Sequence, residues 1–240
     1  MSSVDYRAPE VLAFVIIPIV LAALFVVGVA IAWRRTGAAP RALRAATIAL
    51  VATTAWMGIT WQVAATGVFR QWDAMPPPLA ILVVLLIAIA LRLGLGAVGG
   101  RFARGLPLWV LVGVQGFRLP LELAMHRMAE RGIMPPQMSY SGLNYDILTG
   151  TGAIVVALLL ATGRGGSRLV QLWNVIGLLL LVNIVVIAIL STPLFRYFGD
   201  DRLNVWVTYP PFVWLPAVLV LAALAGHLVV FRALRVRARP

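Results

Sequence analysis

Long apolar runs separated by short polar segments make up most of the chain. A bilayer crossing needs about 20 mostly apolar residues, and a helix satisfies its own backbone hydrogen bonds in hydrocarbon. The pattern therefore predicts an all-α, polytopic transmembrane helical bundle that forms a single domain over residues 1–240. The seven expected spans lie at about 11–33, 45–68, 79–98, 106–128, 146–162, 169–190 and 212–231.

The polar segments between these spans fall into two sets that differ in arginine content. The segments after the first, third and fifth spans, together with the C-terminal tail, hold 12 arginines, and the other segments hold six. Cytoplasmic loops carry the excess of basic residues, so we expect the N-terminus outside and the C-terminus in the cytoplasm. The 12 arginines are Arg34, Arg35, Arg41, Arg44, Arg101, Arg104, Arg164, Arg168, Arg232, Arg235, Arg237 and Arg239.

Two longer segments, 129–145 and 191–211, are then outside loops. The second is rich in aromatic residues, which favour the membrane–water interface, and this predicts an interfacial helix or lid. The loops of the opposite set are short and read as connectors.

The composition supports the membrane interpretation and excludes several kinds of chemistry. The chain is 62% hydrophobic and 12% charged, whereas soluble domains are roughly half apolar and a quarter charged. Cysteine is absent, which excludes disulfides, thiolate catalysis and cysteine-bound metals. All 20 basic residues are arginine, which excludes a lysine Schiff base.

The excess of arginine and alanine is typical of a GC-rich bacterial genome. We therefore expect a multi-pass protein of the bacterial inner (plasma) membrane, with the lipid bilayer as its main partner. The formal charge of +12 does not indicate nucleic-acid binding, because the arginines lie at span ends, where they anchor topology. The pattern identifies no cofactor and no partner protein.

One expected span carries ionisable residues at helical spacing. Arg118, Glu122 and His126 stand four residues apart, and Gln115 joins the same helical face. Ionisable groups in hydrocarbon cost several kcal/mol unless they face protein or water, so this stripe indicates a buried polar site. Pro120 removes one helical hydrogen bond and predicts a kink in the same span.

Polar and aromatic residues elsewhere extend this site into an expected outward-facing pocket among several spans. Asn144 and Asp146 also have a local interpretation, as the cap and the dipole partner of the helix that follows. Asn174 and His227 are expected to be packing or end residues. The expected ligand-binding residues are Arg118, Glu122, His126, Asn144, Asp146, Gln62, Asn183 and Trp214.

The leading functional hypothesis is binding of a small anionic or amphiphilic ligand, with or without its translocation. Arg118 would anchor the anion, with Glu122 and His126 as a proton-linked pair. The alternative is a membrane-embedded hydrolase of a lipid-like substrate, in which Glu122, His126 and Asp146 are catalytic. The same three residues are also a candidate metal site, with one imidazole and two carboxylates as ligands. A third alternative is that Arg118 and Glu122 form a purely structural ion pair.

The stretch that holds these residues resembles a family of uncharacterised bacterial multi-pass membrane proteins. The resemblance covers about the second half of the chain, and it implies no activity, substrate or cofactor. It implies that the polar stripe, the loop at 129–146 and the start of the last span belong to one unit. The residues that carry it are Phe117, Arg118, Glu122, His126, Gly132, Pro135, Met138, Gly142, the run 144–150, Trp206, Pro210 and the run 214–216.

Overall fold

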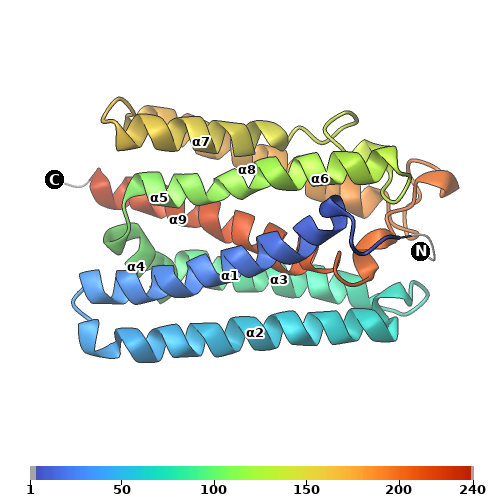
Figure 1. Cartoon of the computed structure of the whole chain (residues 1–240), viewed down its shortest axis with the longest axis horizontal. Helices are drawn as coiled ribbons and strands as arrows, with labels where there is room; N and C mark the ends of the chain where they lie inside the picture. Colours follow the sequence, from blue (N-terminus) through green and yellow to red (C-terminus); the bar gives the residue numbers. More distant parts are fainter. Residues whose placement is uncertain (1–3, 239–240) are drawn as a thin grey trace.

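The computed structural model describes residues 4–238, and this part of the chain is 77% helix with no strand. The long helices run side by side, and α1 begins at the end of the bundle opposite to the one where α9 ends (Figure 1). We call these the N-terminal end and the C-terminal end. Six helices are long and apolar enough to cross a membrane, which agrees with the expected integral membrane protein: α1 (Pro9–Arg35), Ala39–Thr66 with α2 (Ala42–Thr66), α3 (Pro78–Leu95), Leu108–Glu130, α8 (Ser167–Leu190) and Leu215–Arg237.

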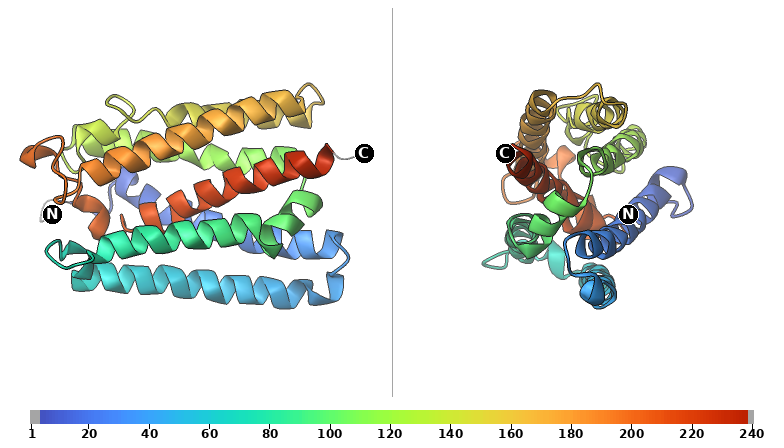
Figure 2. Two further views of the ribbon diagram at one scale, coloured as in Figure 1. Left: turned by 180° about the vertical axis from the view of Figure 1, so that it is seen from behind. Right: turned by 90° about the vertical axis from the view of Figure 1, so that its left-hand side faces the viewer.

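The remaining apolar helix, α7 (Ile147–Ala161), is shorter than these six. Its 15 residues correspond to about 22 Å of helix, whereas the hydrocarbon core is about 30 Å thick. The helix packs against α6 and α8 along the bundle (Figure 2). The seventh crossing and the orientation of the chain therefore remain predictions.

The span expected at 106–128 is one continuous helical stretch, Leu108–Glu130, with a 3-10 turn near its middle. It consists of α5 (Leu108–Gly113), a 3-10 turn η3 (Val114–Phe117) and α6 (Arg118–Glu130). Pro120 has no N–H, so the carbonyl of Gly116 loses its helical donor. The local change to 3-10 geometry at this place is the response of the chain to that loss.

The last span contains a second irregularity that the sequence pattern did not predict. It starts as a π-helix, η7 (Leu215–Val220), and continues as α9 (Leu221–Arg237). Pro216 lies in the first turn of η7 and has no N–H to donate. α9 packs against α3, α4, α5 and α8, so its direction and rotation affect much of the bundle.

Two tryptophans attach the π-helical segment to α2. Trp56 Nε1 donates a hydrogen bond to the carbonyl oxygen of Ala217 at 2.8 Å. Trp214 Nε1 donates in return to the carbonyl oxygen of Met57 at 3.1 Å. The irregular backbone is thereby held by side chains that are large and have few rotamers.

The segments between the long helices differ from expectation in two places. The expected connector after the third span forms a helix, α4 (Ala97–Gly105), which packs between α1 and α9. The loop 191–211 contains two 3-10 turns and no longer helix, so the expected interfacial helix is not observed. The short 3-10 turns of the described chain are η1 (Ala39–Arg41), η2 (Val68–Arg70), η4 (Pro136–Met138), η5 (Asp200–Arg202) and η6 (Trp206–Thr208).

Specific contacts tie the two long loops together at the N-terminal end. Gln137 Nε2 donates to Ser191 Oγ and to the carbonyl oxygen of Arg202, each at 2.9 Å. The buried rings of Trp206, Phe14 and Phe212 also pack edge to face, which attaches the second loop to α1. The loops therefore form a fixed cover on this end of the bundle.

Candidate functional site

The buried apolar side chains form two separate clusters, one toward each end of the bundle. The span 108–130 contributes Val112 to the C-terminal cluster and Leu121 to the N-terminal cluster, and its polar residues lie between them. The segment just before α7, and the helices α8 and α9, contribute polar side chains at the same level. We call these residues the polar layer: Gln115, Arg118, Glu122, Asn144, Asp146, Asn174 and His227, all of them buried.

Arg118 and Asp146 form the charged centre of the polar layer. Nη1 of Arg118 donates to Oδ1 of Asp146 at 2.9 Å, and only 1% of the arginine side chain is exposed. The helices approach closely here because Gly150 has no side chain. A Cβ at that position would collide with the backbone nitrogen of Leu119. Glycine in α7 therefore allows the pair to form between α6 and the start of α7.

Asn144 links the carboxylate of Glu122 to the backbone of Asp146. Its Nδ2 donates to Oε2 of Glu122 at 2.7 Å and to the carbonyl oxygen of Met138 at 3.0 Å. Its Oδ1 accepts from the backbone N–H of Asp146 at 3.0 Å. Asn144 thus holds the entry to α7 and also binds Glu122, which combines the local interpretation with a role in the site.

The alternative of a structural ion pair between Arg118 and Glu122 does not match the contacts observed, because the two residues have separate partners. Helical side chains tilt toward the N-terminus of their helix. Arg118 stands at the first position of α6, so it extends away from Glu122 one turn later. Asp146 lies within its reach, and Glu122 meets Asn144 instead.

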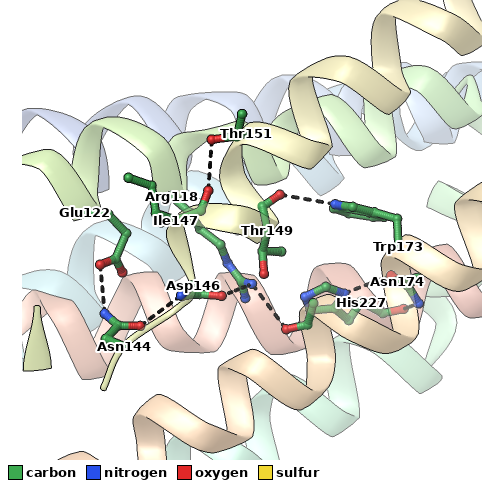
Figure 3. A network of polar contacts seen from close by, with 11 residues as sticks. Arg118, Glu122, Asn144, Asp146, Ile147, Thr149, Thr151, Trp173, Asn174 and His227 are labelled. Atoms are coloured by element: carbon green, nitrogen blue, oxygen red, sulfur yellow. Dashed lines mark hydrogen bonds and ion pairs between the residues drawn. The ribbon is translucent and has the colours of Figure 1, made fainter. Parts of the chain in front are cut away.

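The polar layer continues beyond Arg118 to two residues that the sequence pattern left as packing or end residues. Nδ1 of His227 lies 2.8 Å from Oδ1 of Asn174, and Nδ2 of Asn174 donates to the carbonyl oxygen of His227 at 3.1 Å. Figure 3 shows the guanidinium of Arg118 between Asp146 and this pair. The sequence does show Asn174 and His227 as polar residues inside apolar spans. It does not show that they lie at the same depth in the bundle as Arg118, because that depends on how the helices pack.

Several polar atoms of the layer are buried without a hydrogen-bond partner among residues 4–238. On Arg118 these are Nε and Nη2, while Nη1 also lies 3.5 Å from the carbonyl oxygen of Gly177. Oε1 of Gln115 and Nε2 of His227 are also buried without a hydrogen-bond partner in this part of the chain. Nε and Nη2 form one edge of the planar guanidinium, the fork that binds a carboxylate or phosphate through two parallel hydrogen bonds.

His126 lies outside the polar layer, although its spacing placed it on the same stripe. Its Nδ1 is 3.0 Å from Ser139 Oγ and 3.3 Å from Ser141 Oγ. Its ring stacks on Tyr140 with the centroids 4.3 Å apart, and its Nε2 lies 3.5 Å from Oε1 of Glu130. The structure therefore does not bring His126 together with Glu122 and Asp146.

The other expected ligand-binding residues are also away from Arg118. Gln62 is exposed on the outside of the bundle. Asn183 donates to the carbonyl oxygen of Leu143 at 2.9 Å and so supports the loop before α7. Trp214 packs on Trp61, with ring centroids 5.1 Å apart, near the start of the last span.

The hollows of the structure differ in position from the expected outward pocket. One groove lies between α7 and α8, and a second hollow near Leu95 and Arg235 lies at the C-terminal end. Neither is lined by Arg118 or Glu122. Within the described residues, no three histidine, aspartate or glutamate side chains are arranged to hold a metal ion.

Comparison of the chain with protein-family models, with curated proteins and with solved structures gave no match. The functional argument therefore depends on the polar layer itself. Its chemistry is that of a desolvated cation with one carboxylate partner, a second carboxylate nearby and one donor edge available.

Proposed function

We propose that this chain is a seven-span protein of a bacterial inner membrane that binds a small anionic group, free or carried by an amphiphile, at Arg118. The observation that carries the proposal is the unpartnered edge of a fully buried guanidinium. Leaving a buried donor without an acceptor costs about 1–3 kcal/mol, and more for a charged group. An acceptor with two oxygens would satisfy both donors at once.

The charges of the layer also bear on how the anion binds. Asp146 neutralises Arg118 directly, and Glu122 is a second carboxyl group within the same layer. An added anion would raise the negative charge in a region that water reaches poorly, which is unfavourable. We therefore propose that Glu122 takes up a proton when the anion binds. In this scheme Glu122 alone provides the proton linkage, because His126 lies elsewhere.

The topology part of the proposal rests on the arginine distribution. The loops at 36–41 and 162–166 lie at the C-terminal end of the bundle, together with α4 (Figure 1). That end carries most of the arginines, which favours a cytoplasmic location for it. In this scheme α7 makes the seventh crossing, and the unmatched length is accommodated by the ordered loop before it and by local thinning of the bilayer.

The experiment that tests anion binding uses purified full-length protein in phosphatidylcholine nanodiscs. Thermal unfolding would be followed with increasing acetate, butanoate or inorganic phosphate, since a ligand that binds the native state raises its stability. The informative variant is Arg118→Lys, which keeps a positive charge next to Asp146 but removes the two-donor edge. We expect wild type to be stabilised by at least one of these anions and Arg118→Lys to need roughly tenfold more of it.

The matched control is Arg196→Lys. Arg196 pairs with Asp200 at the same 2.9 Å distance, but on the exposed surface. Its substitution should leave the anion response unchanged. The proposal fails if none of the three anions stabilises wild type, or if the two lysine variants respond identically to wild type.

A second candidate function, ester hydrolysis of a lipid-like substrate, is favoured by the contacts of His126. Ser141 is exposed, lies within 3.3 Å of Nδ1 of His126, and could transfer its hydroxyl proton to that nitrogen while its oxygen attacks an ester carbonyl. Glu130 would orient the imidazole through Nε2. This set replaces Glu122 and Asp146, which do not contact His126.

A fluorophosphonate probe tests the hydrolase directly, because it labels an activated serine covalently. Labelling that disappears in Ser141→Ala and in His126→Phe would support hydrolysis, and Ser167→Ala, on the exposed surface at the C-terminal end, is the control. Absence of labelling in wild type would contradict it.

A further inference from the structure

A groove on the outside of the bundle runs between α7 and α8 and has a volume of about 260 Å³. Its outer walls include Leu148 and Leu172, whose side chains are largely exposed, together with Ile176. In a membrane these side chains would contact lipid tails. The groove is therefore an open apolar surface, accessible from the side of the bundle, and its lining is almost entirely apolar.

The floor of the groove includes a residue that lies against Arg118. Thr149 and Gly177 belong to the lining. The carbonyl oxygen of Gly177 lies 3.5 Å from Nη1 of Arg118. Immediately behind the floor is thus the guanidinium whose Nε and Nη2 lack a protein partner.

Glycine is required at this point of the floor. A Cβ at position 177 would lie 2.6 Å from Cγ2 of Thr149 and 2.7 Å from Cε1 of His227, closer than side-chain atoms approach one another. At one end of the groove, Nε1 of Trp173 donates to the carbonyl oxygen of Thr149 at 3.1 Å and joins α7 to α8. The barrier between the groove and the guanidinium therefore includes Gly177 and Thr149, and access to Arg118 from the groove requires α7 and α8 to separate.

We infer that the ligand at Arg118 is the carboxylate of a fatty acid, which enters sideways from the bilayer with its tail in the groove between α7 and α8. This inference rests on the anion site proposed above. Two observations select this ligand class together. The groove provides apolar contact for a chain, and the buried cation behind it complements an acidic head group and disfavours a neutral one.

The test measures equilibrium binding of radiolabelled dodecanoate to the full chain in phosphatidylcholine nanodiscs. Unlabelled dodecanol, with the same tail and no charge, and butanoate, with the same head group and a short tail, serve as competitors. We expect dodecanoate to bind at least about tenfold more tightly than butanoate, because several methylene groups leave water or loosely packed lipid on binding. Dodecanol should compete weakly.

Variants that fill the groove with a larger side chain test whether the fatty-acid tail binds there. Leu172→Trp enlarges an exposed residue of the groove wall, so it should fold normally and weaken dodecanoate binding by roughly tenfold. Leu179→Trp is the matched control, since Leu179 is equally exposed on α8 but does not line the groove. Arg118→Lys should weaken dodecanoate and butanoate alike.

The possible results separate this inference from the proposed anion site. If butanoate binds as tightly as dodecanoate and Leu172→Trp behaves like Leu179→Trp, the tail site is wrong while the anion site at Arg118 stands. If dodecanol competes as well as dodecanoate and Arg118→Lys binds like wild type, both are wrong. If dodecanoate does not bind at all, the fatty-acid inference is overturned, and the response to phosphate or acetate decides the anion site separately.

Discussion

Asp146 is the only acidic residue that pairs directly with Arg118 in the described chain, at 2.9 Å between Oδ1 and Nη1. The two residues are 28 positions apart in sequence, and both side chains are buried. Breaking a buried pair by removing one partner is expensive, because the other charge stays behind without compensation.

We predict that Asp146→Ala destabilises the protein by about 3–5 kcal/mol. The double variant Arg118→Met with Asp146→Leu should be more stable than Asp146→Ala, since it removes both charges and retains apolar volume. Thermal or denaturant unfolding in detergent measures both effects. Asp200→Ala, in the exposed pair with Arg196, is the control and should change stability little. Equal effects of Asp146→Ala and Asp200→Ala would contradict the assignment of the charged centre.

The close approach of α6 and α7 gives a steric prediction. Gly150→Ala places a methyl group against the backbone of Leu119 and should push the helices apart, at a cost of about 1–3 kcal/mol. Gly58→Ala in α2 is the matched control, because a Cβ there meets no atom within 4 Å. That control should be neutral or slightly stabilising, since alanine is the better helix former. Unfolding measurements on both variants check the comparison.

The bridging position of Asn144 gives a further prediction. Asn144→Leu leaves the Glu122 carboxyl and the backbone N–H of Asp146 without their partner, and should cost about 1–3 kcal/mol for each unsatisfied group. Asn183→Leu, which removes one hydrogen bond at a more accessible place, should cost less. If both variants unfold at the same temperature, Asn144 is not the link described above.

The proposed proton uptake by Glu122 determines the pH dependence of anion binding. If the anion binds best when Glu122 is protonated, its affinity should fall as the pH rises. The other charged groups of the same layer are Asp146 and Arg118. In Glu122→Gln the pH dependence should largely disappear while binding is retained. Titrations of acetate or dodecanoate at several pH values measure this, and an unchanged pH profile in Glu122→Gln would contradict it.

The absence of cysteine makes the orientation directly measurable. We predict that Asp73→Cys, in an exposed segment at the N-terminal end, reacts with a membrane-impermeant maleimide added to intact cells. Ser167→Cys, exposed at the C-terminal end, should react only after the cells are opened. The reverse pattern would show that the chain is inserted the other way round.

The positions of the long helices followed from hydropathy, because a span must be apolar over most of its length. The irregular segments could not be predicted in this way. They arise from local backbone changes near Pro120 and Pro216, and the packing of neighbouring helices decides which changes occur. The groove between α7 and α8 was also inaccessible to sequence analysis, because it results from how two uniformly apolar helices pack.

The candidate site was predicted in part. Spacing identified Arg118 and Glu122 as buried polar residues, and the loop composition identified Asn144 and Asp146. Spacing misplaced His126, because the helix carries it beyond the apolar core to the loop that contains Ser139. It also could not show that His227, more than a hundred residues later, lies at the level of Arg118.

The π-helical start of the last span affects which sequence changes would preserve the polar layer. A π-turn contains one more residue than an α-turn. It therefore shifts the side chains of the following residues by about 100° around the helix axis, compared with an uninterrupted α-helix. His227 lies on α9, after this segment, so its direction depends on that rotation. Substitutions within Leu215–Val220 can be tolerated if the extra residue is kept, whereas deleting one residue would regularise the helix and turn its polar face away. The length of this segment, more than its composition, therefore preserves the polar layer.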